Sequence, residues 1–214
     1  SNSSPSGWSK NFSKNIVFRF LFKVPKKIIV NSKDFKREID KRFNINTKVI
    51  YNPLNTSEIK KLSNKRFKFT FFDNTKIKVI NIARFTDQKD HMTLLKAMLI
   101  LIKKKMNIKL LIMGYGINKN KMQIFISKNK ISKNVKIINF QKNPYKFLKK
   151  SNLFILTSLY EGLPNVLLEA MVLKKFIISS NCPTGPREIL ANGKLGSLFK
   201  TQDIKDLSNK VLDY

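Results

Sequence analysis

The alternation of short apolar runs with helical stretches, which begins at Lys78, constrains the fold of this chain more than any other feature. Nearly continuous apolar runs occupy residues 78–83, 109–113, 135–140, 153–157 and 176–180. Runs of this kind are typical of strands that are covered on both faces, because half-exposed strands are apolar only at every second residue. Such strands form a parallel sheet, and right-handed crossovers place helices on both of its sides. We therefore predict an α/β fold with a doubly wound, Rossmann-like parallel sheet.

Apolar residues at helical spacing separate these runs. The expected helices cover residues 91–102, a segment around Met122 to Ile126, and residues 144–150, 164–173, 186–191 and 203–212. The chain also stops within a helical pattern, and it starts at Ser1 rather than Met, so we interpret it as a fragment of a longer protein.

The segment before Lys78 is less regular. Strands are expected at residues 27–32 and 48–51, and a helix at 34–43. Residues 1–14, rich in Ser, Asn and Gly, are expected to form a loop or a frayed end. Residues 55–75 are polar, with only a short helix expected at 57–62. We place an inter-domain linker around residues 52–57.

The charge balance is strongly basic, with 43 Lys and Arg residues against 13 Asp and Glu, a net charge of +30. Such an excess favours a polyanionic partner such as nucleic acid, an anionic membrane or a phosphorylated substrate. Coding bias in an AT-rich genome would give the same composition, because the cations are mostly lysines scattered among Asn, Ile and Phe. Residues 16–24 are apolar, aromatic and basic, so they fit either a membrane surface or a packed helix or strand.

Cysteine use and apolar run lengths favour the cytoplasm. Cys182 is the only cysteine, so no internal disulfide can form. The longest apolar runs, such as residues 97–102, are too short to span a bilayer, and no signal peptide is recognisable.

The residues that follow the predicted strands point to a site, because ligands of such sheets bind beyond the carboxyl ends of the strands. Arg84 and Lys89 follow the first strand, Gly114 the second and Glu161 the fourth. Arg84 and Lys89 suit a diphosphate, or else form a solvated surface pair.

The segment from Glu161 to Glu169 adds a helix start to this edge. Pro164 lies at or near the first helical position, and the free N–H groups there can bind an anion. Glu161 and Glu169 can accept sugar hydroxyls, although Glu169 alone would read as an exposed helical residue. Glycoside hydrolysis also uses a pair of carboxylates, so it is an alternative reaction for this site. Arg84 and the helix start fit a phosphate-bearing donor better.

Several other chemistries are disfavoured. The first strand is not followed by Gly-x-Gly-x-x-Gly, and the chain has no Walker-type loop, so a dinucleotide oxidoreductase or P-loop enzyme is not expected. His91 and Cys182 are each the only residue of their type, which disfavours a His/Cys metal cluster. We interpret His91 as a helix-surface or packing residue.

An ordered set of motifs over residues 27–214 resembles glycosyltransferase family 4, whose members have the two-domain GT-B fold. The matching segments are VIYNP at 49–53, NIAR at 81–84 followed by Gln88 and Lys89, MGYG at 113–116, SLYEGLPNVLLEA at 158–170 and SNCPTGPREIL at 180–190. The last segment resembles bacterial members that use UDP-activated galactose or N-acetylhexosamine.

The resemblance implies a role for each matching residue. Arg84 and Lys89 would hold the diphosphate and Glu169 the ribose, while Gly114 lies in the glycine turn beside the donor. Glu161 would be the catalytic carboxylate. It would hold the hexose and its phosphates together with the backbone of Gly162, Leu163, Pro164, Asn165 and Val166. The base would be lined by Phe140, Gln141 and Lys142.

The resemblance also implies an activity. It predicts transfer of a hexose from a UDP-sugar, with retention, to a polysaccharide or lipid-linked glycan. The UDP phosphate would help to deprotonate the acceptor, and no metal or other cofactor would be needed. Residues 57–214 would be the donor-binding domain and residues 1–56 the end of the acceptor-side domain with the linker.

Two other functions stay open at this point. A non-catalytic nucleotide-sugar-binding remnant is the main alternative, because most of the acceptor-side domain is not in the sequence. A nucleic-acid binder is disfavoured, because the basic residues are not clustered and no nucleic-acid module is recognisable. We therefore expect no nucleic-acid partner and a cytoplasmic protein, with peripheral contact to an anionic membrane as an option.

Overall fold

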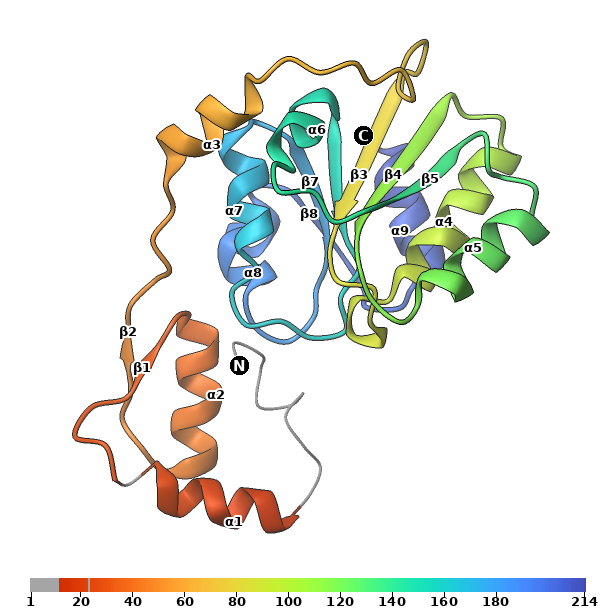
Figure 1. Cartoon of the computed structure of the whole chain (residues 1–214). Coiled ribbons are helices and arrows are strands. Elements are labelled where there is room, and N and C mark those ends of the chain that lie inside the picture. Colours follow the sequence, from red (N-terminus) through yellow and green to blue (C-terminus); the bar gives the residue numbers. More distant parts are fainter. Residues whose placement is uncertain (1–11, 23) are drawn as a thin grey trace.

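A computed structural model of the chain describes residues 12–22 and 24–214 (Figure 1). Most of the loop predicted at residues 1–14 lies outside the described residues. From Phe12 the loop prediction is wrong, since helix α1 spans Phe12–Leu21. In the described part of the chain, no helix is long and apolar enough to cross a membrane.

A six-stranded parallel sheet organises the larger part of the molecule. Its order is β5-β4-β3-β6-β7-β8, and every neighbouring pair is parallel. The strands are β3 (Ile77–Ile82), β4 (Ile108–Gly114), β5 (Val135–Asn139), β6 (Leu153–Leu156), β7 (Phe176–Ser180) and β8 (Ser197–Phe199). The predicted doubly wound sheet is confirmed, although the short β8 was not predicted.

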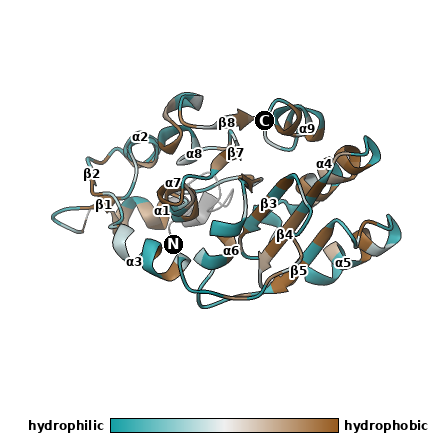
Figure 2. Cartoon of the chain, turned by 90° about the horizontal axis from the view of Figure 1, so that it is seen from above, coloured by the Kyte–Doolittle hydropathy of each residue, from teal (hydrophilic) through white to brown (hydrophobic). Residues whose placement is uncertain are grey.

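Helices cover both faces of this sheet (Figures 1 and 2). One core cluster joins the sheet to α4 (His91–Lys103), α5 (Lys119–Lys128) and α9 (Ile204–Leu212). The other cluster joins it to α6 (Tyr145–Lys150), α7 (Asn165–Val172) and α8 (Pro186–Ile189). Strand residues such as Ile80 and Leu111 are fully buried, which explains their unbroken apolar runs.

Residues 64–76 connect α3 (Thr56–Ser63) to β3, and four of their phenylalanines contact the core although the segment was expected to be polar. Phe72 is buried, and Phe67, Phe69 and Phe71 pack against the second core cluster. Phe67 and Phe69 meet the ring of Phe147 at centroid distances of 4.7 and 5.2 Å. The reading of this segment as polar and patternless is therefore corrected.

The N-terminal segment forms a small unit with its own core. Strands β1 (Ile29–Val30) and β2 (Lys48–Val49) pair in parallel beside α2 (Lys33–Phe43). Val30, Phe35, Ile39 and Phe43 are buried together, and Phe18 of α1 packs on them. Both strands are shorter than predicted.

The apolar segment at residues 16–24 is helical up to Leu21, which fits both a packed helix and a helix on a membrane surface. Val17 and Phe20 stay 55% and 69% exposed. The helix is therefore packed on one side only.

Candidate functional site

The site edge predicted from the sequence coincides with the topological switch point of the sheet. Strands β3 and β6 are neighbours, and the chain winds outward from them in opposite directions. In open α/β sheets, ligands bind in the crevice that this reversal leaves at the carboxyl ends of the strands. The β3 loop carries Arg84 and Lys89, and the β6 loop carries Glu161, so the two loops lie side by side at the switch point.

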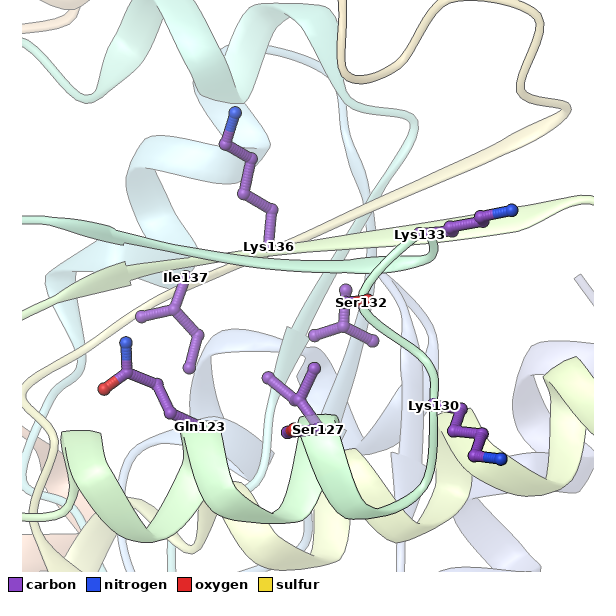
Figure 3. A pocket seen from close by; sticks show the side chains of 9 residues that line it. Gln123, Ser127, Lys130, Ser132, Lys133, Lys136 and Ile137 are labelled. Carbon is purple, nitrogen blue, oxygen red and sulfur yellow. The ribbon is translucent and has the colours of Figure 1, made fainter.

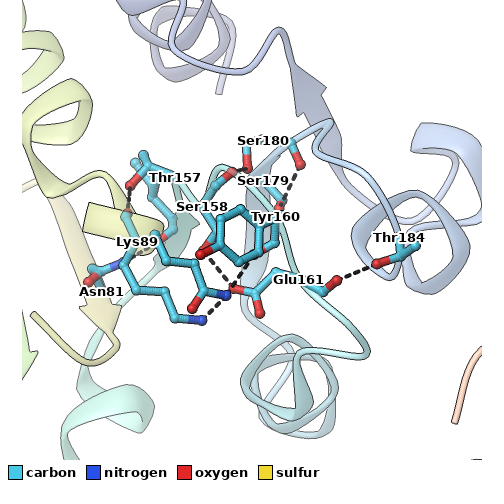
Figure 4. Close-up of polar contacts among 11 residues, drawn as sticks. Asn81, Lys89, Thr157, Ser158, Tyr160, Glu161, Ser179, Ser180 and Thr184 are labelled. Carbon is cyan, nitrogen blue, oxygen red and sulfur yellow. Dashed lines mark hydrogen bonds and ion pairs between the residues drawn. The ribbon is translucent and has the colours of Figure 1, made fainter. Parts of the chain in front are cut away.

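A buried ion pair joins the two loops (Figure 4). Lys89 Nζ lies 2.5 Å from Glu161 Oε1, and the two side chains are 14% and 8% exposed. The Ser158 hydroxyl donates to the same oxygen at 2.6 Å. Among the described residues nothing donates to Glu161 Oε2, so this oxygen keeps its capacity to accept from a ligand.

Backbone contacts fix both loops around this pair. The Gln88 side chain donates to the carbonyl of Tyr160, and the Thr157 hydroxyl donates to the carbonyl of Lys89, both at 2.8 Å. These bonds hold the β3 loop against the β6 loop, so the charged atoms of the pair are preorganised.

The loop after β7 supports Glu161 from the other side. The amide of Glu161 donates to the carbonyl of Pro183, and the Thr184 hydroxyl donates to the carbonyl of Glu161. A Cβ at Gly185, whose φ is +82°, would lie 2.1 Å from the carbonyl oxygen of Gly162. Only glycine allows this approach, so the Pro-Thr-Gly sequence is part of the site.

A pocket of about 190 Å³ lies beside the pair, at the ends of β3, β4 and β5. Its walls are almost entirely apolar and include Arg84, Gly114, Tyr115, Phe140 and Gln141. Tyr115 and Phe140 are 58% and 61% exposed and meet edge to face at 6.1 Å. A Cβ at Gly114 would lie 1.9 Å from the carbonyl oxygen of Ala83. The pocket thus offers two exposed aromatic rings in an apolar lining, which suits a flat ring. Arg84 lies in the wall of this pocket and is exposed, so its guanidinium can bind an anion attached to that ring.

Helix α7 brings a second carboxylate to this edge. Glu169 lies one turn after Asn165 and is partly buried, and burial raises its pKa above the ordinary value. The Tyr145 hydroxyl donates a hydrogen bond to Glu169, which acts in the opposite direction by stabilising the ionised carboxylate. Tyr145 directly follows Pro144, which lines the apolar pocket.

The N-terminal segment reaches the same edge. Glu188 of α8 accepts from the backbone amides of Lys33 and Asp34 at 3.0 and 3.1 Å and from the Tyr51 hydroxyl at 2.6 Å. The Asn52 amide group donates to Asn165 Oδ1 at 2.9 Å. The residues around the predicted linker therefore dock beside the start of α7.

The predicted site residues fall into three groups. Arg84, Gly114, Phe140 and Gln141 line the pocket. Lys89 and Glu161 form the ion pair that joins the two loops. The rest of the predicted set lies at or near the start of α7, namely Gly162, Leu163, Pro164, Asn165, Val166 and Glu169. Lys142 is exposed and does not line the pocket. Their roles in binding stay predictions.

The predicted set of site residues omitted several residues of this edge. They include Tyr115, Pro144, Tyr145, Thr157, Ser158, Thr184 and Gly185. Tyr115 could have been predicted as a site residue, because it lies between the two glycines of the turn after β4. Nothing in the sequence indicated that Tyr145 would meet Glu169.

The single histidine and cysteine are buried. His91 is 3% exposed and packs on the Phe85 ring, which confirms its packing reading, and burial lowers its pKa to about 4. Burial raises the pKa of the Cys182 thiol to about 12. In the described chain, no three His, Cys, Asp or Glu side chains come together as a potential metal-binding group.

Comparison with known proteins assigns the family. The profile of the family described as "Glycosyl transferases group 1" matches residues 63–214, which contain all the site loops described above. The chain belongs to the group 1 glycosyl transferases. The chain is 39% identical over 188 residues to an uncharacterised glycosyltransferase of Methanocaldococcus jannaschii, covering 84% of this chain and 46% of that protein.

A second relative has a named activity. The chain is 27% identical over 205 residues to a Campylobacter jejuni enzyme, named as a 4-alpha-N-acetylgalactosaminyltransferase acting on a diphospho-undecaprenol-linked sugar. The match covers 92% of this chain and 53% of that enzyme. The chain thus spans about half the length of these relatives.

Solved structures confirm the fold. The chain superposes on TarM with a TM-score of 0.81 at 24% identity, covering 99% of this chain and 41% of that one. It superposes equally well, at 19% identity, on Anabaena HepE in complex with UDP and glucose, covering 98% and 58%. These are GT-B glycosyltransferase structures, so the predicted GT-B half-architecture is confirmed.

Proposed function

We propose that this domain binds a UDP-sugar and that the protein transfers the hexose, with retention at the anomeric carbon, to a polysaccharide or lipid-linked glycan. The observation that carries the proposal is the meeting of an aromatic pocket, a buried Lys89–Glu161 pair and the start of α7 at one sheet edge. The relatives support the chemical class, since one is named for a lipid-diphosphate-linked acceptor and another for poly(ribitol-phosphate).

The nucleoside would occupy the pocket and its rim. Phe140 and Tyr115 offer ring faces and edges to a uracil, and Gln141 an amide that can pair with its polar edge. Glu169 would accept the two ribose hydroxyls. It must be ionised to do so, and the Tyr145 hydroxyl favours that state.

The diphosphate would lie between the two loops. Arg84 is exposed at the pocket and can bind two phosphate oxygens at once. The Lys89 ammonium group has three N–H donors and uses one of them in the hydrogen bond to Glu161, so the others can donate to a phosphate. The free amides at the start of α7 add a third source of positive potential.

Glu161 would position the hexose. Its Oε1 is already held by Lys89 and Ser158, so Oε2 is left to accept a hexose hydroxyl. A carboxylate fixed in this way orients the anomeric carbon without having to move during the reaction.

In the transfer step, the bond from the anomeric carbon to the UDP oxygen would break while the acceptor oxygen bonds to the same face of that carbon. The departing phosphate would take the acceptor proton. Arg84, Lys89 and the α7 amides would stabilise the charge that develops on UDP. We therefore propose that turnover needs no metal ion, so that EDTA leaves it unchanged.

The test incubates the protein with a panel of UDP-hexoses and a glycolipid acceptor, and follows UDP release and the anomeric configuration of the product by NMR. Retained configuration, with activity lost in Glu161→Ala, supports the proposal. An inverted product, or undiminished activity of Glu161→Ala, would refute it.

A non-catalytic nucleotide-sugar binder is the second candidate, because the pocket, the Lys89–Glu161 pair and the start of α7 would serve donor binding without transfer. Calorimetry separates the two. Tight binding of UDP without transfer to any acceptor supports the second candidate and contradicts the first.

A further inference from the structure

The distribution of charge along the chain is uneven. Residues 91–160, from the start of α4 to the loop after β6, contain fifteen lysines and no aspartate or glutamate. Twelve of these lysines are exposed. The elements from α4 to α6 therefore carry a strong excess of positive charge, which attracts anionic partners.

The outer face of α5 is the most ordered part of this surface. Lys121, Ile124 and Lys128 recur at spacings of three and four residues, which places them in one stripe along the helix. Ile117 lies in the turn two residues before the helix begins, and we count it as the start of this stripe. All four are exposed, Ile117 and Ile124 at 84% and 66%. The opposite face of α5 is buried through Met122 and Ile126.

The only carboxylate that contacts this helix in the described hydrogen bonds is Asp87, which accepts from Asn118 at 2.8 Å. It lies at the first turn of α5. The two lysines of the stripe therefore have no carboxylate partner among the described residues.

A groove of about 580 Å³ runs beside the stripe, between α5 and the edge strand β5 (Figure 3). Gln123 and Ser127 line it from the helix, and Ser132 from the connecting loop. Lys130 and Lys133 stand on the same loop and extend away from the groove floor, whereas Lys136 points to the other face of the sheet. The groove thus offers hydroxyl and amide donors with two ammonium groups at its rim.

We propose that the stripe and the groove form a docking surface for an anionic lipid membrane. Lysines would contact headgroup phosphates, and the two isoleucines would enter the boundary between headgroups and acyl chains. The isoleucines decide between a membrane and a water-soluble polyanion, because DNA or an anionic glycan gives an exposed Ile no apolar partner. Phosphate oxygens of the headgroups fit the donors of the groove.

The position of the surface agrees with this assignment. Ile117 follows Tyr115 by two residues, so the stripe begins at the mouth of the apolar pocket. A membrane docked there would hold a lipid-linked acceptor close to the site. This link rests on the proposed function, but the docking itself does not require a nucleotide-sugar.

The test is sedimentation of the protein with vesicles of phosphatidylcholine, alone or mixed with phosphatidylglycerol. Binding is expected only to the mixed vesicles and is expected to weaken with salt. Lys121→Gln/Lys128→Gln should lower the partition coefficient roughly 30-fold, at about fivefold per lysine. The matched control Lys60→Gln/Lys205→Gln removes the same charge from exposed positions on α3 and α9 and should change it little.

A second variant tests the apolar part. Ile117→Ser/Ile124→Ser keeps every charge, and it should lose vesicle binding while binding inorganic polyphosphate as the wild type does. Equal vesicle binding by wild type and either stripe variant would overturn the proposal, as would binding to polyphosphate but to no vesicle. Circular dichroism and UDP calorimetry on the same samples show whether each variant is folded. Vesicle binding without UDP binding would count against the proposed function alone.

Discussion

Replacing Lys89 with Met should destabilise the protein strongly, because it leaves the Glu161 carboxylate buried without its ion partner. The two side chains are 14% and 8% exposed, so the pair belongs to the buried class. Breaking such a pair on one side costs about 3–5 kcal/mol. Ser158 still donates to Glu161 at 2.6 Å, which places the expected loss at the lower end, about 3 kcal/mol.

Urea and thermal unfolding followed by circular dichroism measure this loss. For a chain of this size it corresponds to a fall in Tm of about 6–12 °C. Lys89→Met/Glu161→Gln should recover about 2 kcal/mol, because a neutral amide is less costly to bury than a carboxylate. The matched control is Arg37→Met, which breaks an exposed pair with Asp34 and should cost at most about 0.5 kcal/mol. A loss below about 1 kcal/mol for Lys89→Met would refute the buried, preorganised pair.

Three further predictions use the buried titratable groups. Tyr145→Phe removes the hydroxyl that donates to Glu169 and so raises the pKa of that carboxyl further. The affinity for UDP should then fall more at pH 6 than at pH 8. The affinity for 2′-deoxy-UDP, which lacks one of the two ribose hydroxyls, should fall less. Burial lowers the pKa of His91 from 6.5 to about 4, so its contribution to the free energy of unfolding is complete above pH 6.5 and is lost as the pH falls toward 4. Between pH 7.5 and 4.5, the free energy of unfolding in urea should therefore fall by about 2–3 kcal/mol less in His91→Gln than in the wild type. Burial raises the pKa of Cys182 to about 12, so iodoacetamide at pH 8 should label the thiol only in denaturant, and equal labelling of native protein would contradict its burial.

The sheet could be predicted because buried parallel strands leave an unbroken apolar signal, as in residues 153–157 and 176–180. The signal failed for β8, because Ser197–Phe199 is only three residues long and follows two glycines. It also failed for residues 67–72, where Lys68 and Thr70 alternate with phenylalanines that all turn toward the core. An alternating pattern in a segment without strand pairing does not show which side chains are buried.

The site edge could be predicted because its residues follow the strands in the sequence. What could not be predicted is which loops touch, since that depends on strand order. Lys89 and Glu161 are 72 residues apart and meet only because β3 and β6 are neighbours. Arg84, expected beside Lys89, instead lines the pocket at the ends of β3 and β4. The docking of Lys33 and Tyr51 on Glu188 likewise depends on the path of the linker.

Isothermal calorimetry with UDP tests the central claim, that the switch-point edge binds the donor. UDP should bind saturably without added metal, and about 10- to 100-fold more weakly in Arg84→Ala through loss of charge-assisted hydrogen bonds. Lys60→Gln, which removes a charge from exposed α3, should bind as the wild type does. No heat with UDP, or equal affinity in Arg84→Ala, would show that the donor does not bind at this edge.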